Sequence, residues 1–275
     1  MTVVLDASRF EAVYRTAADA LCDLWTPAMQ ERLAVHCHGW RPGAFDFGRY
    51  LRASWMRYYI AYRSIAESGE CRTVCDVGGF FGVFPATLAG LGFQVTMTES
   101  LGYYAGAFDP LFGYLMEKGV TVVDYDPFEV DRPPGRFDAV TVMAVLEHYP
   151  HSPKRFMANV VAMTRERGYV YIEVPNIAYW SKRVDLLRGR TPLSPLLDIF
   201  HSEVPYLGHH HEYTTAELKD LATWSGLRVI RVRHFNYSPQ GTPWQRLRAN
   251  PLETLALAVL PEAREVVSVL CRREE

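Results

Sequence analysis

The chain has 275 residues, a formal net charge of −2 and 49% hydrophobic residues. This length is enough to bury one sizeable α/β core, or a core with a small cap. The near-neutral charge argues against a nucleic-acid-binding surface. The sequence has no run of 18 apolar residues and no basic-then-apolar leader, so we expect neither a membrane span nor an export signal.

The five cysteines are scattered and form no C-x-x-C pair. An odd, scattered set is typical of reduced thiols, which indicates a cytoplasmic protein. Cys75 lies inside the first predicted strand and is expected to be a core residue. The sequence carries no signal of assembly, and a homo-oligomer stays open as a hypothesis.

Residues 1–69 precede the first predicted strand and are expected to form a helical N-terminal cap, ahead of a core domain at 70–275. The richest aromatic segment of this cap is 50–62. Because aromatic side chains contribute much of a protein's buried area, we expect most of them to pack against a sheet. The alternative for Tyr58 or Tyr59 is a lid over a bound ligand.

Residues 74–82 read Val-Cys-Asp-Val-Gly-Gly-Phe-Phe-Gly, a short apolar run that ends in an acid and a glycine turn. A helix-like segment follows at 83–89. This pattern is typical of a buried parallel strand that turns sharply into a helix. Glycine permits positive φ and lets a ligand approach the backbone, where the first N–H groups of the helix are free to meet it.

Helical segments separate the further strands that the sequence predicts. These strands lie at 94–99, 120–126, 137–143, 169–176, 227–235 and 265–271. Strands that alternate with helices form a parallel sheet covered on both faces. We therefore expect an α/β fold with seven strands, mostly parallel, and with the last strand antiparallel. A helical stretch at 252–260 precedes that last strand, and a long insertion at 177–215 follows the fifth.

Ligands bind beyond the carboxyl ends of strands in such a sheet. Glu99 ends the second strand, 23 residues after Asp76, close to the spacing at which a carboxylate holds ribose hydroxyls. Asp124 and Asp126 end the third strand, and His148 follows the fourth. These side chains are therefore expected at one edge of the sheet.

Two further polar residues lie at the ends of predicted strands. Asn176 ends the fifth strand and is expected at the same edge as the acids. Asp138 begins the fourth strand, so it lies at the opposite edge and is expected to be structural.

The acid before the glycine turn separates two kinds of nucleotide ligand. A dinucleotide fingerprint has the spacing Gly-x-Gly-x-x-Gly, whereas this chain has Asp76-x-Gly78-Gly79-x-x-Gly82. A carboxylate there would repel a pyrophosphate but would attract the cationic end of an amino acid. This favours S-adenosylmethionine, which carries an α-ammonium group, a ribose and a sulfonium, over a nicotinamide cofactor.

The whole series of motifs resembles the class I S-adenosylmethionine-dependent methyltransferases, over roughly residues 70–235. The matching pieces lie at 76–82, 99, 137–140, 145–148 and 173–176. Segments 175–192 and 208–218 are similar to a branch that acts on sugars, polysaccharides and natural products. The resemblance implies a Rossmann-like fold of seven strands. One departure is Phe80, which stands where the family usually has a glycine.

The resemblance also implies roles for single residues. Asp76, Glu99 and the three turn glycines Gly78, Gly79 and Gly82 would bind the cofactor. One of the two carboxylates Asp124 and Asp126 would contact the adenine amino group, and the residues themselves leave the choice open.

His148 follows the fourth strand, which is the position nearest the transferred methyl group in this fold. A hydroxyl is a poor nucleophile until a base takes its proton, and histidine is the usual base. His148 is therefore the candidate base, and a role in positioning alone is the alternative. Glu147 would then cap or orient the following helix.

The resemblance places His209 near the acceptor, with His201 and His210 as weaker candidates. Three adjacent histidines, 209–211, cannot all face one site on a strand or helix. No carboxylate pair shows ligand spacing, so we expect no metal.

The aromatic and histidine-rich insertion at 177–215 indicates an enclosing acceptor pocket. Such walls suit a sugar or phenolic hydroxyl, and by analogy with the branch we expect O-methylation of a saccharide or related small molecule. A nitrogen or carbon acceptor is the first alternative. A non-catalytic S-adenosylmethionine-binding protein and an NAD(P)-dependent oxidoreductase are the others.

Overall fold

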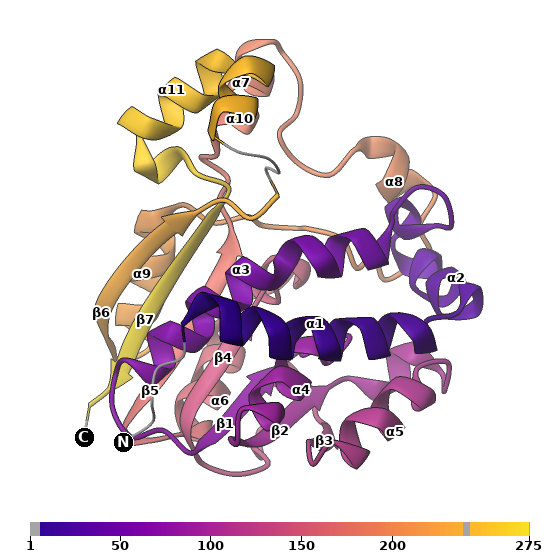
Figure 1. The fold of residues 1–275 in the computed structure, drawn as a ribbon, viewed down its shortest axis with the longest axis vertical. Helices are drawn as coiled ribbons and strands as arrows, with labels where there is room; N and C mark the ends of the chain where they lie inside the picture. Colours follow the sequence, from indigo (N-terminus) through magenta and orange to yellow (C-terminus); the bar gives the residue numbers. More distant parts are fainter. Residues whose placement is uncertain (1–5, 239–242, 275) are drawn as a thin grey trace.

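The computed structural model describes residues 6–238 and 243–274. Its core is one seven-stranded sheet of order β3-β2-β1-β4-β5-β7-β6, in which β7 runs antiparallel to both of its neighbours (Figure 1). The strands are β1 (Thr73–Val77), β2 (Gln94–Glu99), β3 (Thr121–Asp124), β4 (Phe137–Met143), β5 (Thr164–Pro175), β6 (Leu227–Phe235) and β7 (Val266–Arg273). The predicted fold class is confirmed.

One strand is longer than the sequence predicted. β5 begins at Thr164, directly after the preceding helix, rather than at residue 169. Residues 165–167 are Arg-Glu-Arg and exposed, so this part of the strand has no buried face and shows no apolar alternation. Hydrophobic patterning detects only a strand with a buried face.

Helices cover both faces of the sheet (Figure 1). On one face lie α1 (Ala7–Leu24), α3 (Phe47–Ala66), α4 (Val83–Gly90) and α5 (Asp109–Glu117), and on the other lie α6 (Lys154–Met163) and α9 (Thr215–Trp224). Each face has its own buried apolar cluster. None of the described helices is both long and apolar enough to cross a membrane.

The remaining helices lie near the carboxyl ends of the parallel strands (Figure 1). They are α2 (Pro27–His36), α7 (Trp180–Leu187), α8 (Leu196–Phe200), α10 (Pro243–Ala249) and α11 (Pro251–Val259), with the short 3-10 helices η1 (His38–Trp40), η2 (Leu101–Tyr104), η3 (Leu146–His148) and η4 (Pro261–Ala263). Helix α10 was not predicted, whereas α11 matches the predicted helical stretch. Two short helices within 177–215 give the insertion a structure of its own.

The N-terminal segment covers the sheet as well as its edge. The second half of α3 is buried against the sheet through Tyr62 and Ile65. Tyr59 packs on Phe10, with ring centroids 5.3 Å apart, which is the core role expected for most of these aromatics. Tyr58 stacks on Phe84 at 5.3 Å and also lines the cavity described below.

Main-chain hydrogen bonds join the N-terminal segment to the insertion. The N–H of Glu203 donates to the Val35 carbonyl at 2.7 Å, and the N–H of Leu207 donates to the His36 carbonyl at 2.8 Å. The N–H of His38 donates to Oγ of Ser202 at 2.9 Å. These two segments, far apart in sequence, are therefore directly joined in the structure.

Asp138 has the structural role that its position predicted. Its Oδ2 accepts from the N–H groups of Arg72 and Thr73 at 3.0 and 2.9 Å, and its Oδ1 pairs with Arg165 at 2.5 Å. These bonds hold the pKa of Asp138 at about 2 against the opposing effect of burial. Asn176 also has a structural role, because its side-chain amide donates to the carbonyls of Glu262 and Arg264 at 2.8 Å each.

Asp138→Ala is expected to lower the free energy of unfolding by about 1.5–3 kcal/mol, because it removes an ionised acceptor of several hydrogen bonds. The matched control is Asp131→Ala, whose side chain is 74% exposed and pairs only at the surface with Arg155. That change should leave the free energy of unfolding nearly unaltered, because exposed ion pairs contribute little. Urea denaturation with unchanged m values measures both, and equal effects would contradict the structural role.

Candidate active site

A cavity of about 1010 Å³ lies at the carboxyl edge of the sheet. Its walls come from the ends of β1, β2, β4 and β5, from the N-terminal segment and from the insertion. Ligand pockets typically measure about 300–1,000 Å³, so this cavity has room for a cofactor together with a second small molecule.

The glycine turn after β1 forms part of the cavity wall. Gly78 has φ of 66°, and a Cβ there would lie 2.7 Å from Cγ2 of Val145. A Cβ on Gly79 would lie 2.5 Å from Cγ of Met97. Both positions therefore require glycine, and the backbone is left open to a ligand.

Gly82 has a different role from the other two glycines. It does not line the cavity, and a Cβ there would lie 2.2 Å from Cδ1 of Leu115 on α5. With φ of 75°, it allows the start of α4 to pack closely against α5. The geometry thus separates Gly82 from the two glycines that a ligand can reach.

Phe80 adopts the left-handed conformation that a glycine would take more easily. Its φ is 51°, a strain of about 1–3 kcal/mol for a residue with a side chain. Its N–H donates to Oε2 of Glu99 at 2.9 Å, and its ring packs on Phe81 with centroids 4.4 Å apart. These contacts hold the turn in its path despite the departure from the family pattern.

Asp76 is buried beneath this turn and lines the cavity. Its Oδ1 accepts from the hydroxyl of Thr141 at 2.5 Å. Burial raises the pKa of Asp76 to about 7, with smaller upward contributions from Glu99 and Glu173 and a downward one from Arg57. A cationic ligand beside this carboxylate would therefore be stabilised.

The acids after β2 and β3 divide into those that face the cavity and one that does not. Glu99 and Asp126 line the cavity, and burial raises the pKa of each. Asp124 lies outside the lining and accepts from the N–H of Leu101 at 3.0 Å. Of the two adenine candidates, only Asp126 is in reach of a ligand here.

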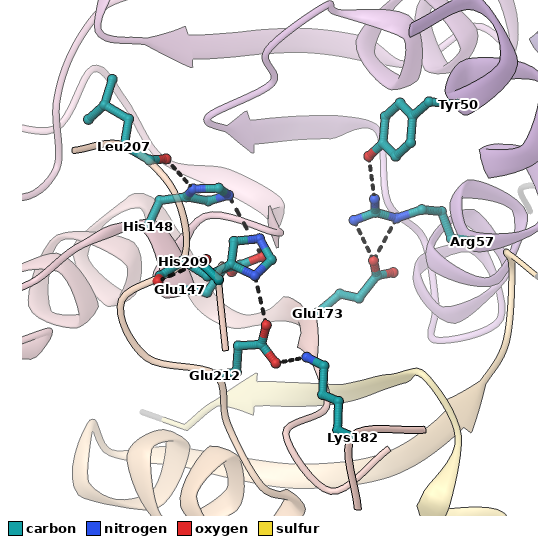
Figure 2. Close-up of polar contacts among 10 residues, drawn as sticks. Tyr50, Arg57, Glu147, His148, Glu173, Lys182, Leu207, His209 and Glu212 are labelled. Atoms are coloured by element: carbon teal, nitrogen blue, oxygen red, sulfur yellow. Dashed lines mark hydrogen bonds and ion pairs between the residues drawn. The ribbon is translucent and has the colours of Figure 1, made fainter. Parts of the chain in front are cut away.

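A buried ion pair from α3 was missed by sequence reasoning. Nε of Arg57 donates to Oε1 of Glu173 at 2.7 Å, and its Nη1 donates to the hydroxyl of Tyr50 at 2.8 Å (Figure 2). Both charged side chains line the cavity. The sequence shows Arg57 within an aromatic-rich helical segment. Its partner Glu173 lies 116 residues further along the chain, so local patterns could not predict the pair.

His148 and His209 come together at one wall of the cavity (Figure 2). Their ring centroids lie 4.8 Å apart at an interplanar angle of 83°. Nδ1 of His148 lies 2.7 Å from the carbonyl oxygen of Leu207, so it carries the hydrogen and donates it. Nε2 of His148 is then left with a lone pair.

The second histidine is oriented by a carboxylate. Nδ1 of His209 bonds to Oε1 of Glu212 at 2.8 Å, and Glu212 also pairs with Lys182 of α7 (Figure 2). Burial lowers the pKa of His209 to about 3 and lowers that of His148 as well. Both rings are therefore neutral and present Nε2 as an acceptor.

Glu147 lies beside these rings and is fully buried. Neither of its carboxylate oxygens has a hydrogen-bond partner in the part of the chain that the structure describes. Its backbone carbonyl accepts from the N–H of His210 at 2.6 Å. Burial raises the pKa of Glu147 to about 8. The sequence had assigned this residue only a helix-orienting role.

The neighbouring histidines face elsewhere. Nε2 of His210 lies 2.8 Å from the carbonyl oxygen of Tyr206, and Nε2 of His211 lies 3.4 Å from Glu217. His201 packs on His38 with ring centroids 5.1 Å apart. Of the histidines in the insertion, His209 is therefore the one that shares the cavity wall with His148.

The sheet order, the glycine turn and the carboxylates beside it define a class I methyltransferase architecture. Residues 47–232 match the family model described as a methyltransferase domain, so the chain belongs to that family. It is an S-adenosylmethionine-dependent methyltransferase. This assignment sets aside the nicotinamide-dependent alternative.

The chain is 33% identical over 170 residues to a ubiquinone biosynthesis O-methyltransferase of Burkholderia multivorans, covering 60% of this chain and 68% of that protein. The protein of the same name from Burkholderia thailandensis is 26% identical over 181 residues, 61% of this chain and 69% of that protein. The N-methyltransferase NodS of Bradyrhizobium japonicum, solved with S-adenosyl-L-homocysteine, has a TM-score of 0.55 at 14% identity and covers 91% of this chain and 100% of its own. That likeness shows a shared fold.

Glu99→Ala is expected to weaken S-adenosylmethionine binding roughly ten- to a hundredfold, because hydrogen bonds to charged groups contribute about 1.5–3 kcal/mol. Asp124→Ala is the control, since Asp124 ends the neighbouring strand but lies outside the cavity. Titration calorimetry measures both affinities. An unchanged affinity in Glu99→Ala would contradict the assignment of Glu99 to the ribose.

Cofactor affinity is also expected to depend on pH through Asp76. The pKa of about 7 means that binding an ammonium group below that pH must displace a proton from Asp76. Affinity should therefore rise by up to about tenfold per pH unit as pH increases toward 7, and then level off. Calorimetry from about pH 5.5 to 8 tests this, and Asp76→Asn should bind weakly without the rise.

Proposed function

We propose that this enzyme methylates a hydroxyl group of a small molecule. The observation that carries the proposal is the pair of neutral histidines, His148 and His209, whose Nε2 atoms are free to accept a proton. They form part of the wall of the same cavity as the glycine turn. An acceptor hydroxyl needs such a base, whereas a neutral amine already has a free lone pair.

The residues present fit S-adenosylmethionine. Asp76 would offer a carboxylate to the α-ammonium group, Gly78 and Gly79 leave the backbone open, and the cavity-lining Glu99 and Asp126 would bind the ribose and the adenine amino group. When bound, the cofactor supplies an electrophilic methyl carbon on a sulfonium. The cavity-lining carboxylates of Asp76 and Glu99 would stabilise the positive charge of the cofactor.

His148 would accept the proton of the acceptor hydroxyl at Nε2, because its Nδ1 is committed to the Leu207 carbonyl. That bond also fixes the ring orientation. His209, oriented by Glu212 in the same way, would accept a hydrogen bond from a second hydroxyl or N–H group of the acceptor molecule. Holding the acceptor in line with the methyl group contributes to the rate independently of the base.

We also propose that segments 1–69 and 177–215 enclose the bound ligands as a cap. They are hydrogen-bonded to each other, and both contribute side chains to the cavity. Closure over the site would exclude water from the reaction.

The acceptor belongs to one of two classes with the same reacting group. The aromatic and histidine-rich insertion favours a sugar hydroxyl, and the names of the Burkholderia relatives favour a ring hydroxyl. Aromatic cavity residues such as Trp40 and Tyr179 can stack on either. Methyl transfer from labelled cofactor to panels of glycans, phenols and amines separates these classes, and transfer to amines alone would overturn the proposal.

His148→Ala is expected to lower kcat by about 10²–10⁴-fold, the usual contribution of a general base, with cofactor affinity nearly unchanged. His211→Ala is the matched control, because its ring points toward Glu217 rather than into the cavity. Single-turnover methyl transfer measures both. If His148→Ala keeps near-full activity with a hydroxyl acceptor, the base role is wrong and a nitrogen or carbon acceptor becomes the better hypothesis.

A further inference from the structure

Three hydrogen-bond acceptors converge at one point of the cavity wall. Glu147, His148 and His209 each offer one ligand atom, and these atoms all lie within 4.8 Å of one another (Figure 2). Nε2 of His148 is 4.0 Å from Oε1 of Glu147. Since both Nδ1 atoms carry the ring hydrogens, no hydrogen atom of the rings lies between the three groups.

Such an arrangement is unfavourable unless something positive occupies its centre. Glu147 is 0% exposed, and both of its oxygens lack a partner among the described residues. A buried carboxylate without a partner is strongly destabilising. The occupant must be either a proton or a cation.

The surrounding contacts resemble those of metal-binding histidines. A ligating histidine usually donates its other ring N–H to a carboxylate or a backbone carbonyl, which fixes the ring and its tautomer. Glu212 supplies the carboxylate for His209, and Leu207 supplies the carbonyl for His148. Both outer partners belong to the insertion, so this segment completes the arrangement.

We propose that Glu147, His148 and His209 bind a divalent transition-metal cation, with Oε of Glu147 and Nε2 of the two rings as ligands. This revises the expectation of no metal, which rested on the absence of a carboxylate pair. Two imidazoles and one carboxylate suit Zn²⁺, Mn²⁺, Fe²⁺ or Co²⁺ better than Mg²⁺ or Ca²⁺. Binding would draw the three ligand atoms closer together, to bonds of about 2.0–2.2 Å.

The remaining coordination positions would face the cavity, because all three residues line it. A hydroxyl of the acceptor would fit there, and the cation would lower the pKa of that hydroxyl, whose proton would leave to water. The Nε2 lone pair of His148 would then hold the cation rather than the proton. This catalytic consequence rests on the hydroxyl acceptor of the proposed function and replaces His148 as its base, whereas metal binding itself does not depend on that function.

The test is titration of the chelator-treated protein with Co²⁺, followed by its visible absorption and competed with Zn²⁺. We expect one Co²⁺ per chain, with no thiolate-to-metal charge-transfer band, since the cysteines are not part of the site. Glu147→Gln and His209→Ala should each weaken binding at least tenfold. Glu212→Gln should weaken it about ten- to a hundredfold by releasing the His209 ring.

His211→Ala is the matched control and should bind Co²⁺ as the unchanged protein does. Thermal unfolding and cofactor binding verify that each variant folds, and either ligand variant alone is sufficient for the test. No Co²⁺ binding by the unchanged protein, or unaltered binding by the folded ligand variants, would overturn the proposal and leave a proton on Glu147 as the occupant. Binding at these residues without methyl transfer to any hydroxyl would instead overturn the proposed function and leave the metal site standing.

Discussion

The hydrogen bond from Nδ1 of His148 to the Leu207 carbonyl joins the two halves of the site. It links η3, at the end of β4, to an insertion that begins after β5. The N–H of His210 makes a second link to the carbonyl of Glu147. Together these bonds hold His209 against His148 and decide which ring nitrogens face the cavity.

The cavity wall is rich in acids. Asp76, Glu99, Glu147 and Glu173 all line the cavity, and of these four carboxylates only Glu173 forms an ion pair with an arginine, Arg57. Burial raises the pKa of all four, because it disfavours their charged forms. A cavity wall of this kind is suited to binding cations. Cations would stabilise these carboxylates at two places in one cavity. The sulfonium and ammonium groups of the cofactor would do so at one, and the proposed metal ion at the other.

The strand–turn–helix at residues 73–90 shows how much of the site could be predicted from sequence patterns. The apolar run of β1, the acid and the glycines have local causes, so the turn could be predicted and is found with Gly78 at positive φ. Gly82 could not be told from Gly78 in the same way, because the difference is a contact with Leu115 on another helix. Asp124 and Asp126 are likewise equivalent in sequence. They differ only in whether the chain after β3 turns the side chain toward the cavity.

The sequence by itself determined the succession of strands along the chain, with helical segments between them. It also determined the edge of the sheet where ligands bind and the histidine that follows the fourth strand. These features follow from local periodicity and from the rule that parallel strands share their carboxyl ends. Only the tertiary structure decided that His209 rather than His210 or His211 meets His148, that Glu147 is buried without a partner, and that Arg57 pairs with Glu173. Each of these depends on side-chain direction and on contacts between distant segments, which no periodicity in the chain encodes.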